Sequence, residues 1–571
     1  MNLPSLTESL IRNTLEVSLP RFAPELVLCA TIVALLLARV IPLLDRIPPF
    51  AIALVGSLAA FIAAVPEGGL TPAALGAIER QEIFTRMVVY DSMTVFMRLF
   101  LAGFAVLFVI LSRLTGIADR DDGQDYYALV FGATVGMCLM ASANHLLTVF
   151  LGVEMASVPS FVLAGIIKGR RRSSEAALKY AVYGAGAAGI MLYGTSLAAG
   201  LLGSAHIPTM AQRLIEFDLP TKAAAGDLSV LGLALGGLMI GVGLAFKLSA
   251  VPFHFWCPDV FEGAAAEVGA FLSVASKAAA LALLVRVGLG LGYAPNEMAS
   301  APAEQPGFQL TAAAQPTAEA APAEETAPES PRVTADFELP LSPVRRFFVS
   351  LTAVVAIVTC TFGNLAAYGQ KNIKRMLAYS TIAHAGFMMM PVAAAVAQAG
   401  SDLPGARTAV SAVLLYVIMY LFMNLGAFAI VAFLRNSMRS EEIKDYAGLI
   451  QRSPLAAISL TIILVSLIGL PPLAGFWPKL RVLLSLYEAG GPLLVFVMIA
   501  AAANTAIALV YYLRVCKTMC IDTQPDSSLP VELGFLPAAF VVAMAAPLLI
   551  YGLLPDLVAP WAHYAAAGLF G

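Results

Sequence analysis

The stretch GLMIGVGLAFKLSAVPFHFW, residues 237–256, is almost wholly apolar, yet it holds Lys247 in its middle and Pro252 five residues later. An apolar run of this length is typical of a membrane-spanning helix. Proline interrupts such a helix and a buried ammonium group is costly, so both residues need a reason to be there. The stretch predicts a transmembrane helix that breaks next to a cation.

The composition of the whole chain agrees with this interpretation. Its 571 residues are 59% hydrophobic and 12% charged, with a mean hydropathy of +0.83, whereas soluble domains carry about 25% charged residues. The sequence therefore predicts an all-α polytopic membrane protein. The first apolar run can serve as the membrane anchor, so no secretory signal is expected. The net charge of −3 points to no class of partner, and no nucleic acid is expected.

Apolar runs of about 18 or more residues mark fourteen expected transmembrane helices. They lie near residues 24–44, 48–65, 92–114, 125–142, 145–167, 175–203, 228–257, 263–292, 346–368, 375–398, 408–434, 454–486, 489–515 and 533–556. The seventh contains the stretch quoted above, and the twelfth contains LIGLPPLAGFWPKLRVLL, residues 467–484. Both are too long for one straight span, and each joins a proline break to a lysine, Lys247 or Lys479. Broken helices that run in opposite directions predict two inverted five-helix repeats, helices 4–8 and 9–13.

This pattern divides the chain into five regions. They are residues 1–124 with helices 1–3, residues 125–292 as the first repeat, residues 293–345 as an outer loop, residues 346–515 as the second repeat, and residues 516–571 with a loop and helix 14. Within the outer loop, residues 295–342 are rich in Ala, Pro and Glu and show no apolar periodicity. Such a segment cannot bury enough surface to offset its ordering entropy, so disorder is expected there.

Deleting most of residues 295–342 while keeping a short polar link should leave assembly and activity near normal, because this composition supports no core. The amount of protein in the membrane and its activity check the expectation. Loss of the protein from the membrane would show instead that the loop makes contacts the fold needs.

Positive charge alternates along the expected loops. Loops after odd-numbered helices carry most of it, in the groups Arg39 and Arg46; Arg113 and Arg120; Lys168, Arg170, Arg171 and Arg172; Lys371, Lys374 and Arg375; Arg435, Arg439, Lys444 and Arg452; and Arg514 and Lys517. Because basic loops stay on the cytoplasmic side, both termini are expected on the outer side.

Several ionisable residues fall inside the expected spans, where such groups are costly and indicate a pathway by default. They are Glu154, Lys179, Lys247, Lys277 and Lys479, with His254 and His384 near helix breaks or ends. Lys179 lies about two turns from a basic loop and can also snorkel to the surface. Asp91 and Arg98, seven residues apart at the start of helix 3, are interpreted as structural. Each of the two histidines is either a packed side chain whose ring nitrogens have hydrogen-bond partners or a carrier of protons.

Four buried lysines against one glutamate are not a set of balanced structural pairs. A single pair can fix helix register, but excess lysines need water or must at times be neutral. Burial disfavours a charged ammonium group and a nearby carboxylate restores it, so such groups exchange protons when a neighbour moves. Lys247 is therefore interpreted as a proton-relay site at a helix break.

The cysteines give no sign of a cofactor. They are Cys29, Cys138, Cys257, Cys360, Cys516 and Cys520. Cys516 and Cys520 lie one turn apart, but no further Cys or His completes a metal set, so all six are interpreted as apolar fillers. No haem or iron–sulfur spacing and no glycine-rich nucleotide loop is found in the sequence. No metal and no redox cofactor is expected in this chain.

Five segments carry a family resemblance. They are SSEAALKYAVYGAGAAGIMLYG, FKLSAVPFHFWCPDVFEGA, FLSVASKAAALALLVRV, NIKRMLAYSTIAHAGF and GLPPLAGFWPKL. Together they resemble the N-subunit family of bacterial NADH–quinone oxidoreductase, respiratory complex I, closely over helices 4–13. The resemblance implies fourteen helices with two inverted repeats and a proton-translocating subunit of the membrane arm in the bacterial inner membrane.

The resemblance also implies roles for individual residues. The family's acid on helix 5 matches Glu154 and its paired lysine matches Lys179, while its central lysines match Lys247 and Lys277 and its later lysine matches Lys479. NADH, FMN, iron–sulfur clusters and quinone are expected in partner subunits, so this chain would be a non-redox subunit of an enzyme. Two positions depart from the family pattern. Glu267 lies where a Thr-Pro pair is usual, and Pro478 replaces a small residue.

The expected mechanism is a relay. Protons would reach Lys247 from the cytoplasm, pass through Lys277 and His384, and leave near Lys479. Opening or closing of a Glu154–Lys179 pair would shift the proton affinity of Lys247. The alternatives are an Mrp-type Na⁺/H⁺ antiporter subunit and a membrane subunit of a hydrogenase-type complex. A stand-alone solute transporter would need more polar groups at the breaks, and a scaffold would tolerate Met at the buried lysines.

Overall fold

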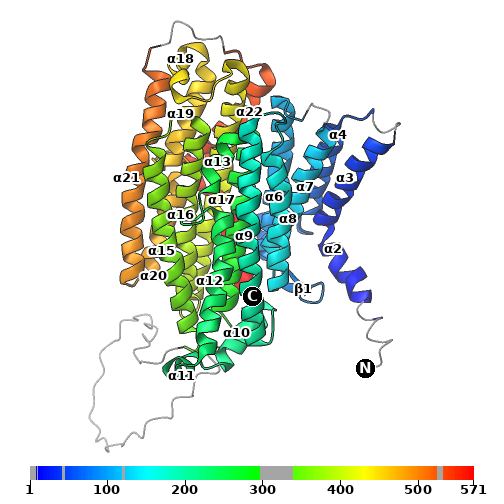
Figure 1. Ribbon diagram of the computed structural model, residues 1–571, viewed down its shortest axis with the longest axis vertical. Helices are drawn as coiled ribbons and strands as arrows, with labels where there is room; N and C mark the ends of the chain where they lie inside the picture. The colour runs from blue at the N-terminus through cyan, green and yellow to red at the C-terminus, as the bar shows by residue number, and fades with distance from the viewer. Residues whose placement is uncertain are drawn as a thin grey trace, which may run out of the picture.

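The computed structural model describes residues 8, 11–41, 46–118, 122–295, 297, 339–523 and 531–570. Its long helices run nearly parallel to one another, and within the described part the sheet is one antiparallel pair of short strands (Figure 1). In the described part, twelve helices are long and apolar enough to cross a membrane. Two shorter apolar helices, Pro49–Ala63 and Pro454–Ile468, coincide with the remaining expected segments. The prediction of an all-α polytopic membrane protein is confirmed.

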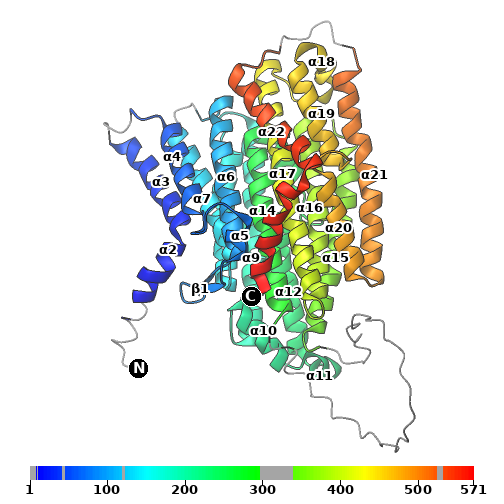
Figure 2. The same ribbon diagram turned by 180° about the vertical axis from the view of Figure 1, so that it is seen from behind.

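The N-terminal region precedes the first expected repeat and packs along one side of it (Figure 2). Its elements are η1 Thr14–Ser18, α2 Leu19–Arg21, α3 Ala23–Val40, α4 Pro49–Ala63, α5 Pro72–Gly76, β1 Gln81–Ile83, β2 Val88–Tyr90 and α6 Ser92–Thr115. Asp91 caps α6 by accepting a hydrogen bond from the backbone N–H of Thr94 at 2.8 Å. The short hairpin β1–β2 has no counterpart in the sequence analysis.

The two central regions each hold five expected spans. The first comprises α7 Gly123–Ser142, α8 Leu146–Ala164, α9 Arg171–Leu202, α10 Ile207–Glu216, α11 Leu219–Ala224, α12 Leu228–Leu248, α13 Trp256–Gly263 and α14 Ala266–Gly292. The second comprises α15 Ser342–Ala367, α16 Ile373–Gln398, α17 Leu403–Met438, η2 Ile443–Tyr446, α18 Leu449–Arg452, α19 Pro454–Ile468, α20 Phe476–Ala489 and α21 Pro492–Cys520. The chain then forms α22 Phe535–Leu553, η3 Pro555–Leu557, α23 Ala559–Ala567 and η4 Gly568–Phe570.

The seventh expected span is broken beside its lysine, as predicted. Helix α12 ends at Leu248, one residue after Lys247, and Ser249 takes a left-handed conformation with φ 55°. The chain then crosses to α13, where the indole N–H of Trp256 donates to the carbonyl of Phe246 at 3.2 Å. The backbone N–H of Val251 donates to Thr359 Oγ1 on α15 at 2.9 Å, so the break is anchored to the second region.

The twelfth expected span is broken as well. Helix α19 ends at Ile468, where Gly469 takes a left-handed conformation with φ 87°. Gly475 then lies against the end of α19, where its N–H donates to Ser466 Oγ at 3.1 Å. Pro478 is the third residue of α20. Backbone N–H groups in a first turn have no partner within the helix, so proline is tolerated at this position despite its departure from the family pattern.

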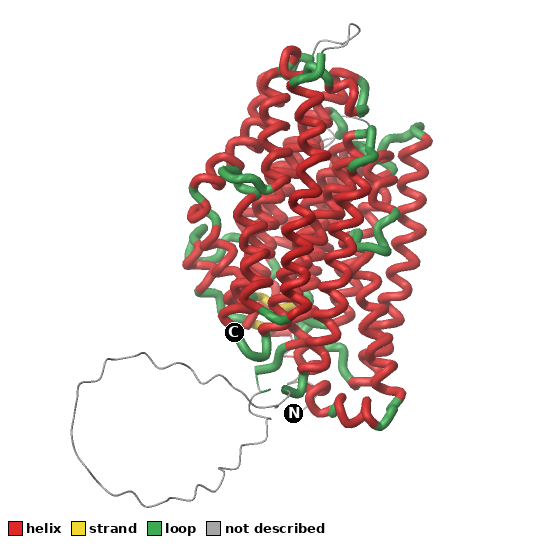
Figure 3. The backbone as a smooth tube through the Cα atoms, turned by 90° about the vertical axis from the view of Figure 1, so that its left-hand side faces the viewer, coloured by secondary structure: helices red, strands yellow, loops and turns green. Residues whose placement is uncertain are grey.

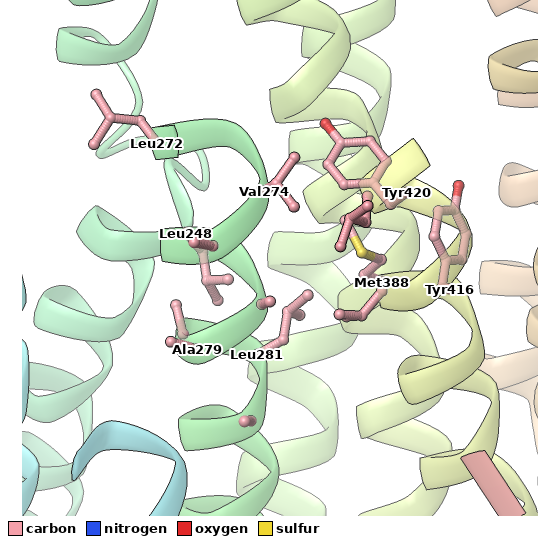
Figure 4. Packing of buried hydrophobic residues seen from close by; sticks show 14 of the residues in the cluster. Leu248, Leu272, Val274, Ala279, Leu281, Met388, Tyr416 and Tyr420 are labelled. Carbon is pink, nitrogen blue, oxygen red and sulfur yellow. The ribbon is translucent and has the colours of Figure 1, made fainter. Parts of the chain in front are cut away.

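The interior of the bundle lies along α14, which is buried over nearly its whole length. Helices α16 and α17 pack beside it, and their side chains meet those of α14 in one apolar layer (Figure 4). Peripheral helices such as α12 and α21 bury only one face, and their other face is apolar and exposed. This distribution suits a bundle whose outer surface contacts lipid or neighbouring subunits.

The loops after the odd-numbered expected helices meet at one end of the bundle, called the basic end here. Contacts that join two such loops are Arg39 Nη1 to Asp125 at 2.6 Å, Lys168 Nζ to Asp122 at 2.6 Å, Arg375 Nη1 to Glu262 at 2.8 Å, and Asn436 Nδ2 to the carbonyl of Thr115 at 3.0 Å. The hairpin, α10 and α11 lie toward the opposite end in Figure 1, and the strands of the hairpin are the yellow segments of Figure 3. Most of residues 295–342 lies outside the described residues.

Candidate functional site

Lys247 is buried in the bundle and bonds to a neutral group. Its ammonium nitrogen donates to Ser157 Oγ on α8 at 3.0 Å, and that hydroxyl donates in turn to the carbonyl of Val153 at 2.6 Å. Glu154 lies one turn before Ser157 on α8. Within the described residues, Lys247 forms no salt bridge with Glu154 and its ammonium group bonds to Ser157 instead.

Two further lysines bind the carbonyl ends of the broken helices. The ammonium of Lys277 on α14 donates to the carbonyl of Leu248, the last residue of α12. The ammonium of Lys479 on α20 donates to the carbonyl of Ile468, the last residue of α19, at 2.8 Å. The last carbonyls of a helix have no partner within it and form the negative end of its dipole. Each break therefore provides a cation site made of backbone.

His384 lies within a buried group of hydroxyls and amides on α16, α17 and α21, called the polar belt here. The belt comprises His384, Ser380, Thr381, Tyr416, Tyr420, Asn424 and Tyr512. The ring nitrogens of His384 bond to the hydroxyl of Tyr416 at 2.8 Å and to that of Tyr512 at 3.2 Å. The sequence analysis missed these partners, although Tyr416, Tyr420 and Asn424 recur at four-residue spacing inside an apolar run.

The belt is separated from the first break. In the view of Figure 4, the apolar side chains of Val274 and Leu281 lie between Leu248 at the first break and the tyrosines Tyr416 and Tyr420. Among the described residues, no hydrogen bond joins the belt to Lys277. The structure thus brings Lys247 and Lys277 together at one break and places His384 in a second polar group.

His254 lies in the first break but contacts aromatic rings. Its ring centre is 4.4 Å from that of Phe362 at an interplanar angle of 63° and 5.1 Å from that of Phe255. These contacts favour the packing interpretation of His254 over the proton-carrying one.

The expected pairing of Glu154 with Lys179 is not what the structure shows. Lys179 Nζ lies 2.7 Å from Asp259 Oδ2 on α13 and 2.8 Å from Glu175 Oε1 one turn earlier on α9. Asp259 and Glu175 lie nearer the basic end, and the long lysine side chain extends toward them rather than toward Glu154. The sequence analysis chose the wrong partner, because Asp259 follows the break and its direction depends on how α13 folds back.

Asp259 also connects Lys179 to the second region. Arg375 on α16 lies 2.9 Å from Asp259 Oδ1 and 2.8 Å from Glu262 Oε2. These charged groups line a cavity of about 150 Å³ at the basic end. The segment between the break and α14 therefore carries two carboxylates, three residues apart, that bind cations from both regions.

Asp91 and Arg98 have structural roles, as expected, but they do not act on each other. Asp91 binds Arg286 on α14, with its Oδ1 2.6 Å from Arg286 Nη2. Arg98 Nε donates to Glu25 Oε1 on α3 at 2.6 Å, and both side chains are fully buried. Each pair ties α6 to a different helix.

Comparisons with known proteins identify the family of the chain. The family model described as NADH:quinone oxidoreductase/Mrp antiporter, TM, matches residues 143–300 and 333–504. The NADH-quinone oxidoreductase subunit N of Anaeromyxobacter sp. is 35% identical over 485 residues, which are 83% of each chain.

Solved structures share the fold. A chain of respiratory complex I from Thermus thermophilus aligns over 94% of this chain and 98% of its own length, with a TM-score of 0.67 and 27% identity. A chain of the Mrp complex from Dietzia sp. aligns over 96% of this chain and 98% of its own, with a TM-score of 0.71 and 18% identity, which shows the fold alone. This chain therefore belongs to the NADH:quinone oxidoreductase/Mrp antiporter transmembrane family and is a relative of NADH-quinone oxidoreductase subunit N.

Proposed function

We propose that the chain is a proton-translocating membrane-arm subunit of NADH–quinone oxidoreductase in the bacterial inner membrane, with the basic end facing the cytoplasm. It acts as a non-redox subunit of that enzyme. NADH, FMN, iron–sulfur clusters and quinone are assigned to partner subunits, whose redox chemistry supplies the drive.

One observation carries this proposal. The lysines at the breaks, Lys247, Lys277 and Lys479, donate to a hydroxyl or a backbone carbonyl. Other buried cations face carboxylates at short distances: Arg98 to Glu25 at 2.6 Å, Arg345 to Glu297 at 2.7 Å and Lys374 to Glu441 at 2.9 Å. A lysine with neutral partners can lose its proton without leaving a buried anion unpaired, whereas a paired one cannot.

The proposed route begins at the basic end and reaches the Lys247–Lys277 pair at the first break. It continues through His384 and the polar belt to Lys479, and leaves at the opposite end. Water and side-chain movement must connect the first break to the belt, because apolar residues lie near both. Moving one unit charge against 100 mV costs about 2.3 kcal/mol, so the drive has to come from other subunits.

The lateral surface supports a position between such subunits. Glu154 is only half-buried on α8, and Leu151, Met155 and Val158 around it are exposed. A carboxylate inside a span does not face lipid, because the bilayer offers it neither water nor a counter-ion. A neighbouring membrane subunit that covers this face would complete the environment of Glu154.

Lys179 and Asp259 are expected to act as one unit that shifts the proton affinity of Lys247 at the first break. Lys179→Met and Asp259→Asn should each lower coupled turnover by several-fold, because each leaves a buried or half-buried charge with fewer partners. The double variant should lose less than the product of the two single losses, which a double-mutant cycle of NADH-to-quinone turnover measures.

Glu154→Gln combined with Lys179→Met is the matched control for that cycle. Since the structure places these two groups with different partners, their effects should multiply independently. Multiplicative losses for Lys179 and Asp259 would contradict their coupling.

The function itself is tested on the purified native complex. Co-purifying flavin, iron–sulfur and quinone-reactive subunits, together with NADH-driven proton uptake by proteoliposomes, are the expected result. Exchange of Na⁺ for H⁺ without redox subunits would favour the second candidate, an Mrp-type antiporter subunit, whose fold this chain shares. Co-purification with a hydrogenase would favour the third candidate, a membrane subunit of a hydrogenase-type complex.

A further inference from the structure

A polar cavity of about 260 Å³ lies at the basic end between α6, α7, α8 and α17. Its lining includes Asp122, Arg170, Arg435 and Asn436. Tyr126 also lines it, and its hydroxyl bonds to Ser112 Oγ deeper in the bundle at 2.9 Å. The cavity is therefore polar, charged and large enough for water, and it lies at the face from which the proposed route begins.

Glu267 lies directly behind one wall of this cavity. Its side chain is fully buried, whereas that of Arg435 is 19% exposed. Arg435 Nη2 lies 3.2 Å from Glu267 Oε1 and Arg435 Nη1 lies 3.4 Å from Oε2. The guanidinium thus separates the carboxylate from the cavity.

The pair is looser than the other buried arginine–carboxylate pairs described above. Arg98 and Glu25 are 2.6 Å apart, and Arg345 and Glu297 are 2.7 Å apart. Charge-assisted hydrogen bonds are typically about 2.7–2.9 Å long. Arg435 Nη2 also has another acceptor, since it donates to Asn436 Oδ1 at 3.0 Å. The guanidinium of Arg435 is therefore held by Asn436 as well as by two long bonds to Glu267.

Glu267 lies on the same helix as Lys277. It lies in the first turn of α14, where the helix dipole favours a carboxylate. Lys277 lies ten residues further along the same helix, about 15 Å away at 1.5 Å per residue. Because α14 is buried over nearly its whole length, a proton moving along it stays inside the protein.

We propose that Glu267 is the proton-loading carboxylate of this subunit and that Arg435 is its movable cover. When Arg435 releases Glu267 and keeps its bond to Asn436, water from the cavity reaches Glu267, and the carboxylate takes a proton from hydronium and leaves water behind. When Arg435 returns, the proton leaves Glu267 through internal water for the neutral amine of Lys277, and the carboxylate is regenerated. Arg435 stays protonated throughout. This inference rests on the proposed function and adds the first acceptor of its route.

Inside-out membrane vesicles expose the basic end and allow a direct test, read as membrane potential and as NADH-to-quinone rate. Glu267→Gln keeps the volume and removes the proton acceptor, so both readouts should fall by about tenfold or more in an assembled complex. Glu267→Ala should lower both readouts as far, but added formate should restore them, because the vacated space admits a small carboxylate. Formate should not rescue Glu267→Gln, whose amide fills that space.

The buried Glu25 provides the matched control. Glu25→Gln also removes the partner of a buried arginine, so it should lower the amount of assembled complex but leave pumping per complex unchanged and insensitive to formate. Wild-type pumping by Glu267→Gln would overturn the proposal, as would a Glu267→Ala complex that formate does not rescue. Loss of assembly in both Glu267 variants would assign the residue a structural role and overturn it as well.

Lys247→Met in the same vesicles separates the two proposals. If Lys247→Met abolishes pumping while Glu267→Gln pumps like the wild type, only the proposed loading role of Glu267 is rejected. Normal pumping by Lys247→Met would remove the proton-relay function on which this inference rests.

Discussion

Lys247→Met gives an assembled complex that neither pumps protons nor sustains quinone-linked turnover: this is the largest functional effect we expect. The ammonium of Lys247 bonds to Ser157 Oγ and not to a carboxylate, so methionine can fill its volume without leaving an anion at bonding distance. Coupled turnover should stall because redox work cannot proceed when the proton path is blocked. Electron transfer from NADH to an artificial acceptor should remain intact.

The measurement is proton uptake by proteoliposomes alongside subunit content on native gels. Lys247→Arg should not restore pumping fully, because guanidinium does not readily release its proton. Lys374→Met is the matched control, since Lys374 is also fully buried but lies 2.9 Å from Glu441. Removing it leaves that carboxylate unpaired, at a cost of about 3–5 kcal/mol, so this control should lose assembly. Normal pumping by Lys247→Met would end the relay hypothesis.

Gly475→Ala should prevent accumulation of the assembled complex. A Cβ at this position would lie 1.8 Å from the carbonyl oxygen of Ser466 and 2.8 Å from its carbonyl carbon. Both atoms belong to the backbone of α19, so no side chain can move aside, and the strain should exceed the usual range of about 1–3 kcal/mol for overpacking. The second break, and with it the bond from Lys479 to Ile468, should not form.

Native gels and thermal stability of solubilised membranes measure this effect. Gly189→Ala on α9 is the control, because no atom lies within 4 Å of the added Cβ. It should assemble like the wild type. A stable, active Gly475→Ala complex would show that α20 can move away from α19 without loss of the site.

The breaks and their lysines could be predicted from the sequence because the signals are local. A proline and a lysine close together in an apolar run are unfavourable in a straight transmembrane helix, whatever surrounds it. The segments around Lys247 and Lys479 therefore indicate breaks without any knowledge of the tertiary structure. The partners of the charged groups are different. Lys179 binds Asp259 rather than Glu154, and this depends on α13 folding back after the break, a tertiary feature that no short pattern encodes.

Other features were missed for similar physical reasons. The polar belt joins residues of three helices, and a tyrosine in an apolar run is equally suited to packing against lipid. The amphipathic helix α10 follows a span directly and gives no apolar run long enough to be recognised as one. The departure at Glu267 was visible in the sequence, but its partner Arg435 lies 168 residues away.

The bonds from Lys277 to Leu248 and from Lys479 to Ile468 give the two breaks of the proposed route the same chemistry. At each break the proton is held by an amine against the last carbonyl of a half-helix. Transfer between two equivalent sites contributes little net downhill bias, so the subunit itself would conduct protons in either direction. The direction of proton movement would then be set by the other subunits of the complex. A sufficiently large membrane potential should drive protons inward through the same residues, with oxidation of quinol and reduction of NAD⁺ in those subunits.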